Sequence, residues 1–140
     1  MRPSRYPLAI GLMAAAALAL GACSITSVEG SAPPPVENAD DFAAVIVASD
    51  MAFSNGKTGV SDQPFGVPAD EAFELLFVNE DAMPHNVAVY TDESASTPIY
   101  VGEMITGTRG QVESIPALPA GEYFFRCDLH PAMVGTIVAS

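Results

Sequence analysis

Short apolar runs, several of them alternating with polar residues, fill the chain from about residue 42 onward. Each run is bounded by Gly, Pro, Asp or Asn, and the periodicity of an amphipathic helix is nowhere sustained. The pattern predicts strands at Ala43–Ala48, Ala72–Asn79, His85–Tyr90, Gln111–Ile115, Glu122–Cys127 and Val134–Val138, with weaker signals near Met51–Phe53 and Ile99–Val101. Short strands at this spacing indicate an all-β fold, an antiparallel sandwich of two sheets.

The run at 72–79 carries apolar residues on both of its faces. One face has Phe73, Leu75 and Phe77, and the other has Leu76 and Val78. Because successive side chains of a strand point to opposite sides, this strand is expected to be covered on both sides. Ser54–Pro68, rich in Gly, Ser, Asp and Pro, is predicted to be a loop, and Thr91–Ser96 a loop or a short helix.

The first 22 residues are predicted to be an export signal. Two arginines precede an apolar run, Leu8–Leu20, that is too short to span a bilayer, which takes about 20 apolar residues. The run ends in Leu20-Gly21-Ala22-Cys23, which resembles a bacterial lipobox, so Cys23 is the predicted lipidation site. A plain secretory signal cut near Ala22, with Cys23 incidental, is the alternative.

Residues 23–41 are rich in Ser, Pro and Glu and lack apolar periodicity. They are predicted to form a flexible, lipid-anchored tether that holds one domain, residues 42–140, at the outer, periplasmic face of a cell membrane. The domain is expected to be water-soluble and monomeric.

The chain is acidic, with 5 basic and 17 acidic residues and a net charge of −12. Without Arg2 and Arg5 of the export signal it would carry about −14. Such a field disfavours nucleic acid and anionic lipid and steers a basic partner toward the protein. Acidity that only keeps an exported protein soluble is the other explanation.

The candidate chemistry lies in one short motif and one distant histidine. The chain has two histidines, His85 and His130, and His130 lies midway between Cys127 and Met133 in a Cys-x-x-His-x-x-Met sequence. If Cys23 carries lipid, Cys127 has no disulfide partner, and an unpaired thiol in an oxidising compartment calls for an explanation such as metal binding. Each residue alone is more often structural, but their joint occurrence favours a metal site.

Copper suits these four side chains better than zinc does. A thiolate and a thioether favour Cu(I), imidazoles bind either oxidation state, and two His, one Cys and a weak axial Met form an electron-transfer copper site. Structural zinc prefers four strong ligands, and methionine is not among them. The residues therefore predict one copper held by His85, Cys127, His130 and Met133.

Two sequence stretches resemble the copper-binding signatures of the cupredoxins. They are Phe77-Val78-Asn79-Glu80-Asp81-Ala82-Met83-Pro84-His85-Asn86-Val87 and Gly121-Glu122-Tyr123-Phe124-Phe125-Arg126-Cys127 with the motif that follows. The resemblance covers about residues 72–91 and 111–140. Within the family, the short loop and the Met-Pro-His-Asn-Val run are most similar to amicyanin, with plastocyanin and pseudoazurin as near relatives. The resemblance implies a Greek-key β-sandwich with one type 1 copper.

The resemblance also implies roles for neighbours of the ligands. Asn86 should tie the two ligand segments together, and its backbone N–H is placed to donate to the Cys127 sulfur. Leu129 stands where relatives usually have proline, so its N–H is available as a second donor to sulfur, or it points elsewhere. Alternation along the strand places Tyr123 and Phe125 on the same face as the sulfur.

His130 follows the family position whose ring edge reaches the surface. Apolar residues should surround that edge and form a contact patch for a redox partner, unless they only pack the loop. They are Met83, Pro84, Pro131 and Ala132.

The leading hypothesis is a single-electron carrier, not an enzyme, whose redox partner is a basic, cytochrome-like protein. A catalytic copper centre needs further histidines and a binuclear one needs a second cysteine, and the chain supplies neither beside the predicted site. A copper-binding or delivery protein of the cell envelope is the second hypothesis, and a purely structural member of the fold is the third.

Overall fold

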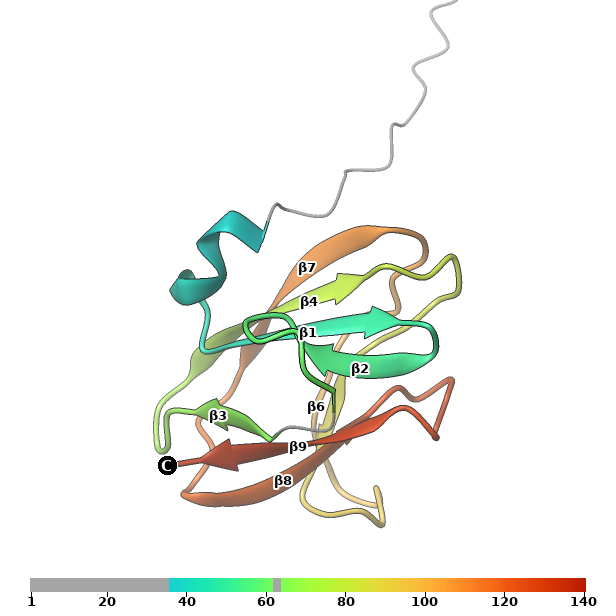
Figure 1. The fold of residues 1–140 in the computed structure, drawn as a ribbon. Coiled ribbons are helices and arrows are strands. Elements are labelled where there is room, and N and C mark those ends of the chain that lie inside the picture. Colours follow the sequence, from blue (N-terminus) through green and yellow to red (C-terminus); the bar gives the residue numbers. More distant parts are fainter. Residues whose placement is uncertain (1–35, 62–63) are drawn as a thin grey trace, which may run out of the picture.

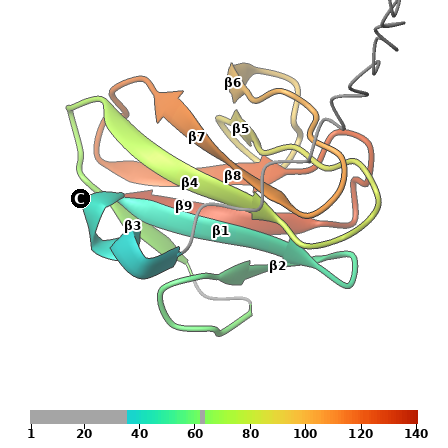
Figure 2. The same ribbon diagram turned by 90° about the horizontal axis from the view of Figure 1, so that it is seen from above.

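The computed structural model describes residues 36–61 and 64–140. They form two β-sheets packed face to face, preceded by the 3-10 helix η1 (Val36–Asp41) (Figures 1 and 2). No helix in this part of the chain is long and apolar enough to cross a membrane. The predicted export signal, Cys23 and most of the predicted tether lie outside the described residues.

One sheet has four strands and the other has five. The first has the order β2 (Ala52–Asn55), β1 (Ala44–Ser49), β4 (Phe73–Asn79) and β7 (Arg109–Ile115). The second has the order β3 (Phe65–Val67), β9 (Val134–Ala139), β8 (Gly121–Arg126), β5 (Ala88–Tyr90) and β6 (Pro98–Val101).

The predicted two-sheet sandwich is confirmed, but its sheets are mixed and not purely antiparallel. β1 pairs in parallel with β4, and β3 pairs in parallel with β9. The chain leaves the first sheet for β3 and then returns beside β1 as β4. Such a return is a crossover and not a hairpin, and a crossover allows parallel neighbours.

Most of the predicted strands are present, and the differences are local. β3 was missed because it has only three residues inside a Gly- and Pro-rich stretch, and tertiary packing of Phe65 and Val67 against the core fixes it. The predicted strand at 85–90 is shorter, and residues 91–96 form turns instead of a helix. The weak signal at 51–53 corresponds to β2, which begins one residue later.

Helix η1 lies within the stretch predicted to be a tether. Ala39 and Phe42 pack against a small apolar cluster formed by Val45, Leu76 and Val78 on the outer face of β1 and β4. The fold therefore begins before residue 42, and this cover explains why β4 is apolar on both faces. The predicted two-sided burial of β4 is confirmed, since six of its seven residues are buried.

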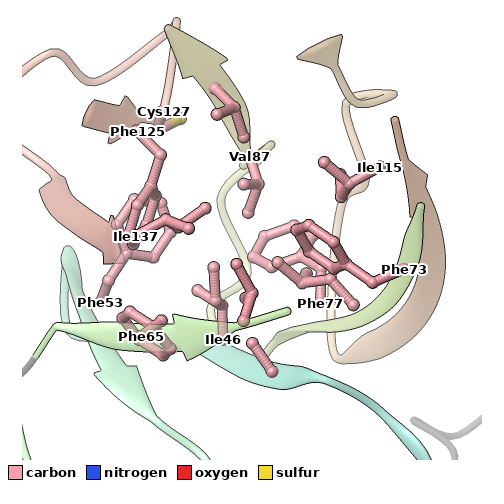
Figure 3. Close-up of a cluster of buried hydrophobic side chains, with 14 of the residues drawn as sticks. Ile46, Phe53, Phe65, Phe73, Phe77, Val87, Ile115, Phe125, Cys127 and Ile137 are labelled. Carbon is pink, nitrogen blue, oxygen red and sulfur yellow. The ribbon is translucent and has the colours of Figure 1, made fainter. Parts of the chain in front are cut away.

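The main core fills the space between the sheets and is rich in phenylalanine (Figure 3). The ring of Phe125 lies 5.2 Å from that of Phe53 and 5.4 Å from that of Phe65, measured between centroids. Opposite it, Gly135 has no side chain, and a Cβ there would lie 2.3 Å from the Phe125 ring. Cys127, two residues after Phe125, lies at the edge of the same cluster. The core thus supports the strand that delivers the thiol.

Candidate metal centre

The predicted ligands come from two connections at one end of the sandwich. His85 lies between β4 and β5, and Cys127, His130 and Met133 lie between β8 and β9. The turns that follow β1, β4 and β8 meet at this end, on the right of Figure 1. Residues separated by about forty positions in sequence are therefore brought together.

Three donor atoms converge on one point. Cys127 Sγ lies 3.7 Å from His85 Nδ1 and 3.6 Å from His130 Nδ1, and the two Nδ1 atoms lie 3.1 Å apart. Among the described residues, these three form the only group of His, Cys, Asp and Glu side chains close enough to hold one ion. The same ring nitrogen of both histidines faces the thiol, so both imidazoles are oriented toward a common centre.

Met133 belongs to the same compact loop. The Cys127 N–H donates to the Met133 carbonyl at 3.0 Å, and the Met133 N–H donates to the His130 carbonyl at 2.8 Å. The methionine side chain is buried in the main core, as is Cys127. The hydrogen bond between Cys127 and Met133 therefore closes the loop, and His130 lies at its middle.

The two histidines differ in exposure. His85 is fully buried, whereas His130 is half-buried and reaches the surface of the loop. This agrees with the expectation that the edge of the second imidazole faces the solvent. Another molecule could therefore approach the predicted metal centre most closely on the side of His130.

Asn79, which the sequence interpretation did not single out, holds the His85 segment. Its buried side-chain amide donates to the Met83 carbonyl at 2.8 Å and to the Ile105 carbonyl at 3.0 Å. His85 and Ile105 exchange both of their backbone hydrogen bonds. The segment before the first histidine is thus tied to the connection that precedes β7.

Asp81, also missed from the sequence, contacts the ring of His85. Its Oδ2 lies 3.0 Å from His85 Nε2, and its carboxylate accepts the backbone N–H groups of Asp50 and Met51. Burial by itself would raise the pKa of Asp81, but the hydrogen bonds from Met51, Asp50 and His85 lower the pKa below its usual value. The only sequence signal for this contact is that Asp81 lies four residues before His85. In a chain with 17 acidic residues, that spacing does not distinguish Asp81 from other carboxylates.

Asn86 links the two ligand segments, as expected. Its Oδ1 accepts the Asp128 N–H at 2.9 Å, and its side-chain amide donates to the Gly102 carbonyl at 3.2 Å. The link runs through the side chain of Asn86.

The hydrogen bonds expected from the Asn86 and Leu129 N–H groups to sulfur stay predictions. Among the described residues, the recorded polar contacts of Cys127 Sγ are with the two imidazoles. Leu129 lies in a bend beside His130, with 52% of its surface exposed.

Asp128 connects the ligand loop to the surface. The Tyr90 hydroxyl donates to Asp128 Oδ1 at 2.5 Å, and Arg126 Nε donates to the same oxygen at 3.3 Å. Burial and the neighbouring Asp128 carboxylate raise the pKa of Tyr90. Arg126 also lies over the Tyr90 ring, 5.1 Å from its centroid.

A buried carboxylate lies beside Gly102, in the connection between β6 and β7. Glu113 of β7 accepts hydrogen bonds from Tyr100 and from Gln111, the latter at 3.1 Å. A Cβ at Gly102 would lie 2.7 Å from Glu113 Oε1, so Gly102 leaves room for the carboxylate. Burial raises the pKa of Glu113 despite both hydrogen bonds.

Apolar side chains are exposed around His130. Met83 is 50% exposed, Leu129 is 52% exposed, and Pro131 and Ala132 are also exposed, whereas Pro84 is half-buried. Met51 and Met104, in the neighbouring turns, are exposed as well. Three of the four predicted patch residues are thus exposed, and a contact with a redox partner stays a prediction.

The donor set fits copper. Two imidazoles, a thiol and a buried thioether offer both soft and borderline ligands, which suits an ion that alternates between Cu(II) and Cu(I). The carboxylate of Asp81 contacts the far nitrogen of His85 and is not among the side chains that converge on the site. The buried thiol is screened from solvent by the core.

Two auracyanins are solved structures with a similar fold. Auracyanin from Roseiflexus castenholzii aligns with a TM-score of 0.55 and 18% identity over 69% of this chain and 94% of its own. Auracyanin A from Chloroflexus aurantiacus, a "blue" copper protein, aligns with a TM-score of 0.55 and 18% identity over 69% of this chain and 96% of its own. Amicyanin from Paracoccus versutus aligns with a TM-score of 0.48 and 26% identity over 70% of this chain and 81% of its own.

A search of curated protein sequences found no match. The two auracyanins share the fold with this chain at an identity too low to carry more than the fold. The sequence profile of the cupredoxin-like domain matches residues 12–139, nearly the whole chain. On this match, with the sandwich and the His-Cys-His-Met constellation at its end, the chain belongs to the cupredoxin-like family.

Proposed function

We propose that this protein is a one-electron carrier with a single type 1 copper held by His85, Cys127, His130 and Met133. The observation that carries the proposal is the convergence of two Nδ1 atoms and one sulfur, all within 4.8 Å of one another, at the end of a rigid sandwich. When bound, copper supplies the chemistry, since it accepts and releases one electron. The protein supplies ligands that both oxidation states tolerate.

The surroundings of the ligands support electron transfer without substrate chemistry. His85 and Cys127 are buried, so solvent is kept from the thiol, while half-buried His130 offers a short route to the surface. Both histidines of the chain lie in this one centre, which leaves none for a second, catalytic copper. We therefore propose a carrier and not an enzyme.

A docking patch for a basic redox partner is part of the proposal. Leu129, within the His130 loop, and Met83, in the β4–β5 connection, are exposed, and exposed carboxylates such as Glu80 and Glu103 lie in the connections that follow β4 and β6. With a net charge of −12, the protein would attract a cationic partner over long range, and the apolar patch would allow brief contact. The association rate with such a partner should fall as ionic strength rises.

The proposed location is the outer face of a membrane, where lipidated Cys23 would anchor the chain. The lipobox-like Leu20-Gly21-Ala22-Cys23 supports this location, and a plain secretory signal is the competing explanation. Cys23→Ser should release the protein from the membrane fraction if the anchor exists. Mass spectrometry of the mature N-terminus distinguishes a lipidated Cys23 from a free one.

The test of the carrier function is copper reconstitution. Cu(II) added to the metal-free protein should give an intense blue charge-transfer band and reversible voltammetry. Cys127→Ser should abolish the band, while Met133→Leu should keep a coloured site with an altered potential. A parent protein that stays colourless with Cu(II) would overturn the proposal.

Copper delivery remains a second candidate because three methionines are exposed around the same end. Met51, Met83 and Met104 are each 44–50% exposed, and thioethers favour Cu(I). A delivery protein should pass Cu(I) rapidly to an acceptor chelator, and replacement of these three residues by leucine should slow the transfer. A carrier should retain copper in both oxidation states and be indifferent to that replacement.

A further inference from the structure

Asp81 lies between the predicted metal ligand His85 and the β1–β2 turn. Its Oδ1 accepts the Asp50 N–H at 2.9 Å, and its Oδ2 accepts the Met51 N–H at 3.2 Å and lies 3.0 Å from His85 Nε2. The Asp81 N–H in turn donates to Asn79 Oδ1 at 2.9 Å. One carboxylate therefore joins the β1–β2 turn to the first histidine.

The β1–β2 turn depends on this carboxylate. Asp50 and Met51 both have positive φ values, 52° and 61°, in a tight hairpin where glycine or asparagine is preferred. Neither residue is glycine, so the turn has an energetic cost that its surroundings must offset. The two amide groups that point at Asp81 provide part of that compensation, since hydrogen bonds to a charged acceptor are strong.

The same carboxylate contacts the nitrogen of His85 that faces away from the predicted metal centre. A carboxylate 3.0 Å from Nε2 favours a proton on Nε2, and the neutral ring then has an unprotonated Nδ1. Nδ1 is the nitrogen that lies 3.7 Å from the Cys127 sulfur and 3.1 Å from His130 Nδ1. His130 has no such carboxylate among its hydrogen-bond partners in the described chain, and its recorded polar contacts are with Cys127 Sγ and His85 Nδ1.

We infer that Asp81 is the positioning residue of the centre: its carboxylate locks the His85 ring in the metal-binding tautomer and couples that ring to the β1–β2 turn. The inference rests on the proposed copper function and deepens it. A carboxylate behind a ligating imidazole makes the imidazole a better donor and stabilises Cu(II), which lowers the potential. Replacement of Asp81 should then weaken Cu(II) affinity by about 10- to 100-fold.

The competing explanation is that Asp81 only caps a turn. Asp92 offers a matched control, because it is an exposed aspartate that caps its own turn by accepting the Ser94 N–H at 2.9 Å. Asp92→Asn removes the same charge as Asp81→Asn but touches no ligand. Asp81→Glu keeps the charge and tests whether a displaced carboxylate restores the behaviour.

The first measurement needs no copper. Nitrogen-15 NMR of the metal-free full chain should show His85 protonated on Nε2 with slow exchange of that proton, and Asp92→Asn should leave this unchanged. Asp81→Asn should populate the other tautomer, and Asp81→Glu should recover the first at least in part. A native His85 ring protonated on Nδ1 would overturn the inference, even if Asp81→Asn failed to fold.

The second measurement uses the copper-loaded protein. Asp81→Asn should raise the potential, because Cu(II) is weakened more than Cu(I), whereas Asp92→Asn should not move it. A blue parent with an unchanged potential in Asp81→Asn would refute the role of Asp81 and leave the carrier function intact. A colourless parent whose His85 tautomer still depends on Asp81 would refute the carrier function and leave the positioning role.

Discussion

The two segments that supply the ligands are held in different ways. The His85 segment is fixed at its backbone by Ile105, at its ring by Asp81 and through its neighbours by Asn79. The loop from Cys127 to Met133 is closed by its own two backbone hydrogen bonds and joined to the other segment through Asn86 and Asp128. The first histidine is thus part of the scaffold, whereas the second projects from a short loop at the surface.

This difference has a physical consequence for an electron carrier. A buried ligand with a fixed ring keeps the geometry constant while the metal changes charge, which keeps rearrangement small. A half-buried ligand brings the centre within reach of a partner. One residue cannot be both buried and exposed to a partner. In this fold, His85 is the buried ligand and His130 is the half-buried one.

The largest expected effect comes from removing each imidazole in turn. His85→Gly and His130→Gly should both lose the blue band, but added imidazole should restore colour only in His130→Gly. The reason is that the His130 cavity opens to solvent, while His85 is fully buried behind the fold. Visible absorption during an imidazole titration measures the difference, and equal rescue of both variants would mean that the two segments are alike in access.

The next effect concerns the support of the His85 segment. Asn79→Ala removes two donated hydrogen bonds and the acceptor of the Asp81 N–H, and should lower the free energy of unfolding by about 2–4 kcal/mol, because each hydrogen bond contributes about 0.5–1.5 kcal/mol. Asn86→Ala is the matched change on the link to the loop and should cost about 1–2 kcal/mol. Urea unfolding of the metal-free proteins compares them, and a reversed order would place the stronger support at the loop.

A third effect is a dependence of stability on pH that arises at the buried carboxylate of Glu113. Burial raises the pKa of Glu113 above its usual value of 4.5, so the folded protein holds that proton to higher pH than the unfolded chain does. The stability this provides is full below pH 4.5 and is lost as pH rises through the raised folded pKa. Glu113→Gln should therefore flatten the pH dependence of the free energy of unfolding between pH 4.5 and the raised folded pKa, by at most about 1.4 kcal/mol per pH unit. The measurement is the urea midpoint of the parent protein and of Glu113→Gln from pH 4.5 to neutral pH. Parallel curves for the two proteins would contradict a role of Glu113 in the pH dependence.

The smallest expected effect lies on the loop side. Tyr90→Phe removes the hydroxyl that donates to Asp128 and should lower the free energy of unfolding by about 0.5–1.5 kcal/mol. Asp128 keeps its contacts with Asn86 and Arg126, so the loop should stay in place and the blue band should not change. A shift of the band in Tyr90→Phe would show that the loop depends on its surface contacts more than the hydrogen bonds suggest.

The sequence predicted the strands that alternate strongly and missed those that depend on context. β4 has apolar residues on both faces, so its existence and its two-sided burial followed from the pattern alone. β3 has three residues among Gly and Pro, and only its pairing with β9 makes it a strand. The helix η1 was assigned to the tether because its apolar contacts are with distant residues of β1 and β4.

The sequence alone determined the family and the four candidate ligands, because few histidines and cysteines occur and their spacing is specific to one kind of site. It did not determine which groups support them. Asn79, Asp81 and Glu113 are common residue types in an acidic chain, and nothing in their local sequence distinguishes them from solvated ones. Only the tertiary structure, by bringing the connections to one end, decided that Asn79 and Asp81 hold the first histidine in place, and only the packing of β7 decided that Glu113 is buried.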